Sequence, residues 1–383
     1  MFILTEEQRL AVDSFRRYAE KELRPLADKY EKDGGAPDAA TVKQLFRKLD
    51  EFGLITGPLA VEHGGAGIPL VTQALLFEEL AWAWPDLAVG VLIQTNLVAV
   101  MATAGTPAQK EKYLGPLLAS EIIGCFCISE PDVGSNVAAV QTRARPDGDG
   151  WIVNGQKLWI TNGSWSDFAV VVCRTGDAGS NEISLVIVDR AAGYTTRDIH
   201  KMGMNASVTS EVFFDDARTS ADAILGGRGT GLKQTLQAFE RARIYVGLTG
   251  VGIARAALED ATSYAKQRVQ HGKPIAGHQM IQAYIAEMAT ELDAGRLLCL
   301  RAMSMLQEGV RCDTESSMAK WYATEMAVRV ASKAVQIHGG CGITKEFRVE
   351  RHFRNARILP IPDGTTEIQK LIIARNVLGA RAF

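Results

Sequence analysis

The hydrophobic pattern of this chain changes twice, near residue 123 and near residue 228, and these changes constrain its fold more than any other feature. Up to about residue 122 the spacing is helical. Thr5, for example, precedes two glutamates and an apolar series, as an N-cap precedes a helix. After residue 229 the spacing is helical again, and one apolar stripe recurs in steps of three and four: Val251, Ala254, Leu258, Ala261 and Ala265. We expect helices at both ends of the chain.

The middle part has the pattern of a β-sheet. Short apolar or alternating runs bounded by Gly, Asp and Asn are typical of strands. These runs are Ile123–Ser129, Trp151–Asn154, Phe168–Cys173, Ile183–Val188 and Glu211–Phe214. The sequence predicts an α+β protein with an N-terminal all-helical domain (1–122), a middle β-sheet or barrel domain (123–228) and a C-terminal helical bundle (229–383). The Ala-rich stripe lets the helices of that bundle pack closely.

Charge and composition exclude several classes of function. The net charge is -2 and the Lys and Arg residues are dispersed, so we expect no nucleic-acid partner. No uninterrupted apolar run approaches the roughly 20 residues of a membrane span. The amino terminus turns acidic early and lacks the pattern of a signal peptide, so we expect a cytoplasmic protein without membrane insertion. The 6 cysteines lack metal-ligand spacing, which predicts free thiols and no metal site.

Five ordered segments of this chain resemble those of the acyl-CoA dehydrogenases, and the resemblance covers nearly the whole sequence. The segments are Ser129–Asn136, Asn154–Gly163, Arg268–Ile275, Gln336–Ile343 and Pro362–Gln369. The resemblance implies the fold of that family, in which the C-terminal domain is a four-helix bundle. It also implies FAD as cofactor, an acyl-CoA thioester as substrate, an electron-transfer flavoprotein as electron acceptor, and a homotetramer built as a dimer of dimers.

Two of these segments predict contacts to the flavin ring. By resemblance, Ser129 contacts the ring, Ser135 contacts the cofactor and the acyl-CoA, Trp159 packs beside the flavin, and Thr161 hydrogen-bonds near flavin N5. An aromatic face supplies stacking area and a hydroxyl can donate to the nitrogen that receives hydride. Pro131 and a glycine hold the first segment in a turn whose main-chain donors can face the ring.

The remaining predicted FAD contacts lie in the C-terminal part. An arginine such as Arg268 can pair with a pyrophosphate through a bidentate fork, and the resemblance places that pyrophosphate in the neighbouring subunit. His271 stands where the family normally has Phe, so it is either a cofactor contact or a surface or interface histidine. The full set that the resemblance assigns to FAD in this part is Arg268, Gln270, His271, Gln279, Gln336, Gly339, Gly340, Thr365 and Glu367.

The predicted catalytic base is Asp363, and it departs from the family. Relatives usually carry a glutamate before the Gly-Thr pair, and aspartate is shorter by one C–C bond, roughly 1.5 Å. Either the backbone moves closer, another substrate carbon is addressed, or the base is a different residue. Some relatives carry the base one residue before an arginine of the first long helix, but here Ala242 occupies that position. Pro362 replaces a usual tyrosine and resets the local backbone. Asp86 is a distant second candidate.

The predicted substrate contacts follow from the same resemblance. Ser135 and Arg243 line the pantetheine and thioester channel, Glu240 lies near it, and Gly364 belongs to the segment of the base. Tyr245 is larger than the residue usual at its position, so it either narrows the acyl pocket or meets a cyclic or branched acyl group.

The leading function is therefore oxidation of an acyl-CoA to the 2,3-enoyl-CoA, with Asp363 removing the α proton and flavin N5 accepting the β hydride. A cyclic or branched acyl-CoA or an acyl carrier protein thioester would suit the altered base. A flavoprotein oxidase of the nitroalkane oxidase type, a relative that also uses an aspartate, is the main alternative. A redox-silent flavin-binding protein is a third possibility.

Overall fold

The computed structural model describes residues 4–177 and 180–380. It begins with a group of helices, and Thr5 caps the first of them in a capping box with Gln8, as the sequence predicts. The N-terminal helices are α1 (Glu6–Tyr18), α2 (Arg24–Asp33), α3 (Ala39–Asp50), α4 (Leu70–Ala83), α5 (Pro85–Ala104), α6 (Pro107–Gln109) and α7 (Gly115–Leu118), with π-helical turns at Ala19–Leu23 and Lys110–Leu114.

A sheet follows, with the strand order β6-β7-β3-β2-β4-β5-β8 and with β1 pairing parallel to β4. The strands are β1 (Gly124–Cys127), β2 (Arg143–Asp147), β3 (Gly150–Thr161), β4 (Phe168–Arg174), β5 (Ile183–Asp189), β6 (Thr195–Asp198), β7 (Thr209–Thr219) and β8 (Ile224–Leu225). All five predicted runs overlap strands, although Ile123, Ile128 and Ser129 lie outside β1; β2, β6 and β8 were missed because they are short or mostly polar. Alternate residues of β4 face two different cores: Phe168 and Val170 face the helices, and Ala169 and Val171 face a separate cluster within the sheet domain.

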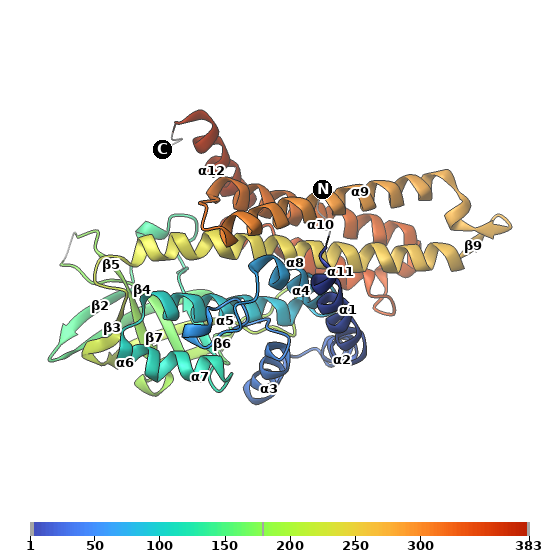
Figure 1. Ribbon diagram of the computed structural model, residues 1–383. Coiled ribbons are helices and arrows are strands. Elements are labelled where there is room, and N and C mark those ends of the chain that lie inside the picture. Colours follow the sequence, from blue (N-terminus) through green and yellow to red (C-terminus); the bar gives the residue numbers. More distant parts are fainter. Residues whose placement is uncertain (1–3, 178–179, 381–383) are drawn as a thin grey trace.

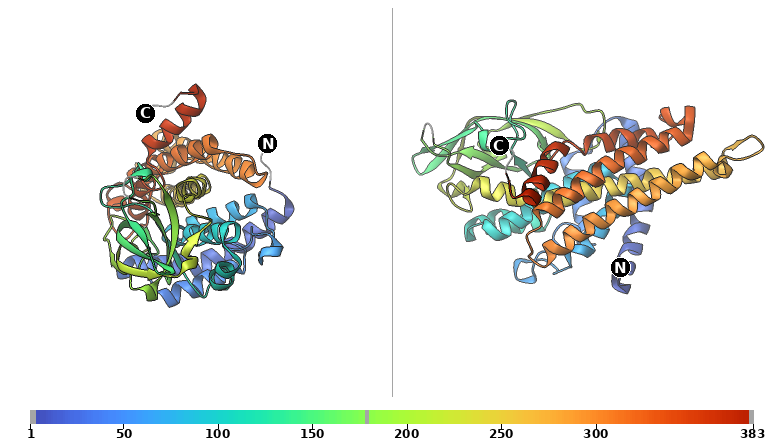
Figure 2. Two further views of the ribbon diagram at one scale, coloured as in Figure 1. Left: turned by 90° about the vertical axis from the view of Figure 1, so that its left-hand side faces the viewer. Right: turned by 90° about the horizontal axis from the view of Figure 1, so that it is seen from above.

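The C-terminal part is built around α8 (Gly231–Gln267), which runs through the centre of the molecule with the N-terminal helices, the sheet and α9–α10 arranged around it (Figure 2). The predicted small-residue stripe lies on its buried faces. A Cβ at Gly252 would come within 2.6 Å of Ala81 in α4, so glycine is needed for this close approach. The other helices are α9 (Gln279–Gln307), α10 (Asp313–His338), α11 (Val349–Ile358) and α12 (Thr366–Leu378), and the two shorter ones, α11 and α12, both pack against α10.

Helix α5 qualifies the expectation about membrane spans. Its 20 residues are long and apolar enough to span a bilayer by length and composition, a feature that a search for an uninterrupted apolar run overlooks. Most of α5 is buried, however, and Gln94 on this helix donates to the carbonyl of Ile122 (2.9 Å) and accepts from the N–H of Gly124 (3.2 Å). These contacts make α5 a core helix that joins the N-terminal helices to β1.

Candidate functional site

The two sheet-domain segments predicted to contact flavin are joined directly. The N–H of Leu158 donates to the carbonyl of Ser129 at 2.9 Å. Next to this contact, the fully buried ammonium of Lys157 donates to Glu130 Oε1 at 2.8 Å. The same ammonium also donates to the carbonyls of Ile128 (3.0 Å) and Val172 (2.8 Å). The buried ion pair therefore fixes the loop that follows β1 against β3.

Glu130 is itself held in the ionised form. Burial alone would raise its pKa, but Lys157 and hydrogen-bond donors hold the pKa below its ordinary value. Its two carboxylate oxygens accept the N–H groups of Gln141 (2.6 Å) and Thr142 (2.9 Å). A charge-compensated carboxylate of this kind is a structural clamp, and it keeps Ser129 beside the part of β3 that carries Trp159.

Trp159 presents an open aromatic face. It lies in a β-bulge where the pairing of β3 with β7 shifts between Lys157 and Ile160, and its φ of 64° is in the left-handed region. Bulges re-aim side chains away from the ladder, and Trp159 remains 59% exposed. A left-handed conformation is uncommon for a bulky residue and points to a functional constraint. An exposed indole beside the Ser129 loop, with Thr161 two residues further along, fits the stacking surface that an isoalloxazine ring requires.

Asp363 lies on the short connection between α11 and α12. It is partly buried, and both Asp363 (φ 54°) and Gly364 (φ 90°) adopt left-handed conformations. Burial raises the pKa of Asp363 above its ordinary value, although the charges of Lys320 and Arg243 act in the opposite direction. Within the residues that the structure describes, neither the carboxylate nor the backbone N–H of Asp363 has a hydrogen-bond partner. Both groups are free to contact a ligand.

Arg243 and Glu240 project from α8 towards the start of α10. Arg243 is buried and donates to Asp313 at 2.9 Å, and Asp313 also accepts from Arg375 of α12 at 2.9 Å. Glu240 Oε1 accepts the N–H of Cys312. The buried Nε of Arg243 has no hydrogen-bond partner among the described residues. The predicted substrate roles of Glu240 and Arg243 stay predictions.

The other predicted contacts of the substrate and of the segment around Asp363 have different surroundings. Tyr245 is buried against Phe77 of α4 with ring centroids 4.8 Å apart, and its hydroxyl donates to Gln73, so its visible role is packing. Ser135 is exposed on its loop. Thr365 is the N-cap of α12 and Glu367 is exposed in the first turn of that helix.

The remaining predicted FAD contacts gather at the opposite end of the bundle. Arg268 ends α8, and it is followed by the hairpin of β9 (Val269–Gln270) and β10 (Lys273–Pro274), which lies far from the sheet in Figure 1. His338 stacks on Tyr264 with ring centroids 4.2 Å apart, which brings the end of α10 to the same place. All seven predicted residues there are exposed: Arg268, Gln270, His271, Gln279, Gln336, Gly339 and Gly340.

The place of His271 in the chain has a local structural explanation, the hairpin turn between β9 and β10. The φ of His271 is 52° and that of Gly272 is 75°, as the two central residues of a tight hairpin turn require. The exposed ring agrees with a surface or interface histidine. Helix α8 starts beside the sheet that carries Ser129 and Trp159 and runs for 37 residues, about 55 Å at the helical rise per residue, before it reaches Arg268 (Figure 1). One chain therefore does not bring the two groups of predicted FAD contacts together.

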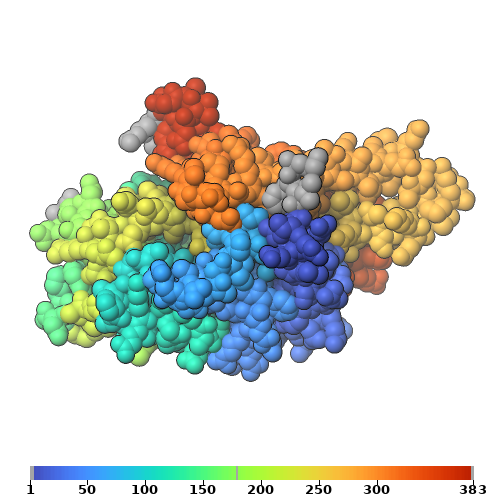
Figure 3. All heavy atoms as spheres, viewed as in Figure 1, coloured from blue at the N-terminus to red at the C-terminus, as the bar shows by residue number. Residues whose placement is uncertain are grey.

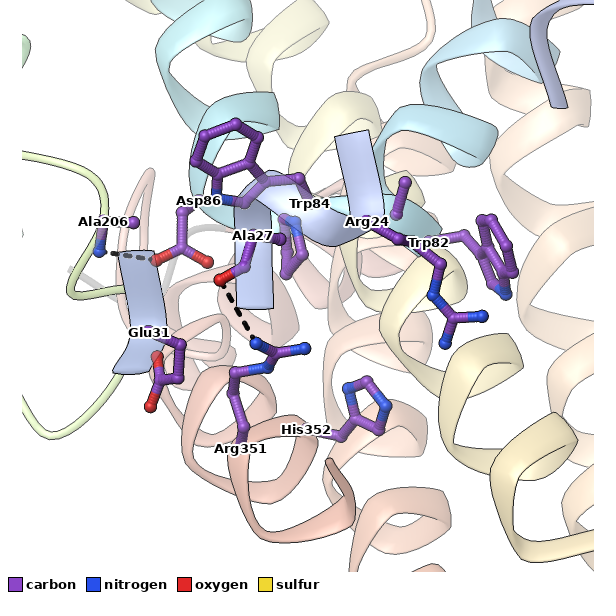
Figure 4. A pocket seen from close by; sticks show the side chains of 11 residues that line it. Arg24, Ala27, Glu31, Trp82, Trp84, Asp86, Ala206, Arg351 and His352 are labelled. Carbon is purple, nitrogen blue, oxygen red and sulfur yellow. Dashed lines mark hydrogen bonds between the residues drawn. The ribbon is translucent and has the colours of Figure 1, made fainter. Parts of the chain in front are cut away.

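Asp86, the second candidate base, lies in different surroundings. Figure 4 shows its carboxylate turned towards the N–H of Ala206, which donates to it at 2.9 Å, in a small pocket that Glu31 and Arg351 also line. Burial raises the pKa of Asp86. Its charged neighbours are Arg351 and Glu31, whereas those of Asp363 are Lys320 and Arg243. Asp86 anchors the loop before β7.

Three residues around the site escaped prediction from the sequence: Lys157, Lys320 and Gln369. Each is buried and contacts main-chain carbonyls. For the two lysines, the signal in the sequence is their place among apolar or small residues, as for Lys320 in Ser317–Lys320. Lysine side chains are usually exposed, so this signal does not by itself predict burial.

The sequence also predicts free thiols and no metal site. The cysteines carry free thiols, and Cys125 and Cys127 share a buried face of β1 with their Sγ atoms 3.7 Å apart. In residues 4–177 and 180–380, no group of three or more His, Cys, Asp or Glu side chains is arranged to hold a metal ion.

Comparison with known protein families assigns all three parts of the chain. Residues 5–121 match the N-terminal domain of acyl-CoA dehydrogenases, residues 125–217 match the middle domain, and residues 229–378 match the C-terminal domain. A probable acyl-CoA dehydrogenase of Bacillus subtilis is 37% identical over 98% of this chain and 99% of its own length. The cyclohex-1-ene-1-carbonyl-CoA dehydrogenase of Geobacter metallireducens is also 37% identical, over 98% of this chain and 99% of its own length.

Solved structures agree over the full length. Butyryl-CoA dehydrogenase from Megasphaera elsdenii superimposes with a TM-score of 0.93 at 33% identity and covers 99% of this chain and 100% of its own. A glutaryl-CoA dehydrogenase from Mycobacterium smegmatis in complex with FADH2 gives 0.91 at 32% identity, with coverage of 99% and 96%. A chain in a structure described as the electron transferring flavoprotein of Acidaminococcus fermentans gives 0.93 at 32% identity, with coverage of 99% and 100%.

Proposed function

Because the chain belongs to the acyl-CoA dehydrogenase family of FAD-dependent oxidoreductases, we propose that it oxidises an acyl-CoA to the 2,3-enoyl-CoA with Asp363 as the base. The observation that carries this proposal is the environment of Asp363. Its carboxylate and its backbone N–H have no protein partner among the described residues, and two cations face it. A base must be ionised and within reach of the proton that it removes.

The proposed reaction divides the work between Asp363 and the cofactor. The Asp363 carboxylate takes the α proton of the thioester, and its N–H donates to the thioester carbonyl, where negative charge develops. When bound, FAD would supply the acceptor of the β hydride, and loss of this hydride and of the α proton would leave a double bond between the two carbons. Trp159, Thr161 and Ser129 would hold the flavin, and Arg243 would bind the substrate.

The altered base favours a cyclic or branched acyl group. An aspartate reaches less far than a glutamate, so a substrate whose α carbon lies closer to the loop suits it better. A 37% identical relative is described as a dehydrogenase of cyclohex-1-ene-1-carbonyl-CoA, which supports an alicyclic thioester.

An anaerobic titration tests this function. The purified protein is mixed with straight-chain, branched and cyclic acyl-CoA thioesters while the oxidised-flavin absorption band is followed. We expect at least one thioester to bleach the band, and the cyclic ones to do so at the lowest concentration. Bound FAD that no acyl-CoA bleaches would contradict the proposal and direct the next titration to nitroalkanes.

We propose an electron-transfer flavoprotein as the electron acceptor. A chain 32% identical to this one occurs in a structure described as such a flavoprotein, and it superimposes over 99% of this chain. The exposed indole of Trp159 gives a partner access to the proposed flavin site.

We also propose a homotetramer in which each FAD contacts two subunits. The two groups of predicted contacts are too far apart along α8 to bind one cofactor within one chain, and the second group is fully exposed. Figure 3 shows α12 and the far end of α9 projecting from the surface. Exposed apolar residues occur on both projections, including Met280, Val377 and Leu378, as at surfaces that subunits cover.

Arg268→Ala tests this shared site. We expect lower FAD content per chain and a larger fraction of smaller species, because the variant loses a fork that can pair with the pyrophosphate of a neighbouring subunit. FAD content is measured from the flavin and protein absorbance, and the oligomeric state by light scattering during size-exclusion chromatography. Full FAD content in an intact tetramer would show that Arg268 does not hold the cofactor.

A further inference from the structure

Lys320 is a buried cation that the proposed reaction does not yet use. It lies on α10 with 0% of its surface exposed. Its ammonium donates to the carbonyl of Pro360 at 3.1 Å and to that of Gly364 at 2.6 Å. Burying an ammonium is costly, and hydrogen bonds to carbonyls offset part of that cost. These two carbonyls lie on either side of Asp363 in the sequence, so Lys320 clamps the segment that carries the proposed base.

Gln369 holds the same segment from α12. Its side-chain NH2 donates to the carbonyl of Asp363 at 3.2 Å and to that of Gly364 at 2.8 Å. The N–H of Thr366 closes the loop on the carbonyl of Pro360 at 3.0 Å. A Cβ at Gly364 would come within 2.7 Å of the Gln369 nitrogen, so the clamp also explains the glycine.

These contacts explain how Asp363 can keep an unfavourable backbone conformation. A non-glycine residue such as Asp363 in the left-handed region persists only where the surroundings over-determine it. With its carbonyl and those of Pro360 and Gly364 bound by Lys320, Gln369 and Thr366, the loop has little freedom left. The Asp363 carboxylate and N–H, in contrast, have no protein partner among the described residues.

Lys320 also places a positive charge near Asp363. The charged groups around it are Asp363 on the loop, Arg243 on α8, Glu325 on α10 and Glu367 on α12. Arg243 is already paired with Asp313. In the described part of the chain, Lys320 forms no ion pair within 4.0 Å, so its positive charge is not offset by a bonded carboxylate.

We infer that Lys320 is a positioning residue for the proposed reaction, because it holds the carbonyls of Pro360 and Gly364 and stabilises the ionised form of Asp363. This inference rests on the proposed function of Asp363. Gln369 also holds the loop, through the carbonyls of Asp363 and Gly364, but it is neutral and cannot stabilise the ionised carboxylate. Variants of Lys320 and Gln369 therefore form a matched pair for experiment.

The sign of the expected pH effect follows from the charges. Burial raises the pKa of Asp363, while Lys320 and Arg243 lower it. Removing the charge of Lys320 therefore raises this pKa further, and the base becomes ionised only at higher pH. Burial also lowers the pKa of Lys320 to about 8, against the effect of Asp363, so the ammonium stays charged at acidic pH.

The experiment compares Lys320→Met with Gln369→Leu. Anaerobic reduction of bound FAD by cyclohexanecarbonyl-CoA and by butyryl-CoA is followed by rapid mixing over a series of pH values. We expect both variants to be reduced at least about tenfold more slowly, since a misplacement of about 1 Å can cost about a hundredfold. The acid limb of the rate profile should move up by about one pH unit or more in Lys320→Met alone, as removal of a nearby opposite charge predicts.

Three outcomes separate the inference from the proposed function. Equal acid limbs in Lys320→Met and wild type would overturn the inference. If Lys320→Met does not fold, Lys320→Arg provides a second test, because it keeps the positive charge. The acid limb of Lys320→Arg should stay at the wild-type pH, and a shift of this limb to higher pH would also overturn the inference. Reduction of Asp363→Asn at the wild-type rate would instead overturn the proposed base, whatever Lys320 does.

Discussion

Asp363→Asn is expected to retain FAD and to lose anaerobic flavin reduction by acyl-CoA, with a rate about 10²- to 10⁴-fold below wild type. The amide has nearly the same shape as the carboxylate but cannot accept the α proton. Asparagine also tolerates the left-handed backbone that Asp363 adopts (φ 54°), so the loop and its N–H donor should keep their places. The measurement is rapid-mixing absorbance of the flavin band, with FAD content determined beforehand.

The pH dependence of wild-type reduction provides a second check on Asp363. Its pKa is raised by burial, so the base is protonated at low pH and the rate should rise with pH as the carboxylate ionises. The acid limb should lie above the ordinary range of an aspartate. If Asp363→Asn were reduced normally, Asp86→Asn would be the next variant, because Asp86 is also a buried carboxyl group with a raised pKa.

The order of the domains could be predicted because it depends on local pattern. The stripe from Val251 to Ala265 fixes a helix, and the runs at Phe168–Cys173 and Ile183–Val188 fix two strands, without reference to the rest of the chain. The strands that were missed are of another kind. β6 (Thr195–Asp198), for example, has no buried residue and exists because β7 pairs with it, a long-range contact that no local pattern records.

The candidate site could be predicted only in part. The motifs single out Trp159 and Asp363 as candidates, but not the conformations that these residues adopt. Both have left-handed backbones that depend on contacts made elsewhere, Trp159 on a bulge against β7 and Asp363 on side chains of α10 and α12. The contacts of Tyr245 were likewise out of reach. The sequence predicts that Tyr245 meets the acyl group, and this stays a prediction; the structure adds that it packs against Phe77 and donates to Gln73, which lie far from it in the sequence.

Lys157→Met is expected to give the largest loss of stability, about 3–5 kcal/mol, because it leaves Glu130 as an uncompensated buried charge. The methionine fills a similar volume but cannot donate to Glu130, Ile128 or Val172, which all accept from Lys157 in the structure. Because the same ion pair joins the Ser129 loop to β3, FAD content should fall as well. Urea denaturation followed by circular dichroism, together with flavin absorbance, measures both effects.

The double variant Lys157→Met/Glu130→Gln separates charge from packing. The neutral amide can still accept the N–H of Gln141 or Thr142, which Glu130 binds through its two oxygens, and no buried charge is left without a partner. We therefore expect the double variant to be more stable than Lys157→Met alone, although below wild type, since the carbonyls of Ile128 and Val172 still lose their donor. Equal stability of the single and double variants would mean that these carbonyl contacts, and not the ion pair, hold the two flavin segments together. FAD content would then follow the loss of stability in both variants instead of recovering in the double one.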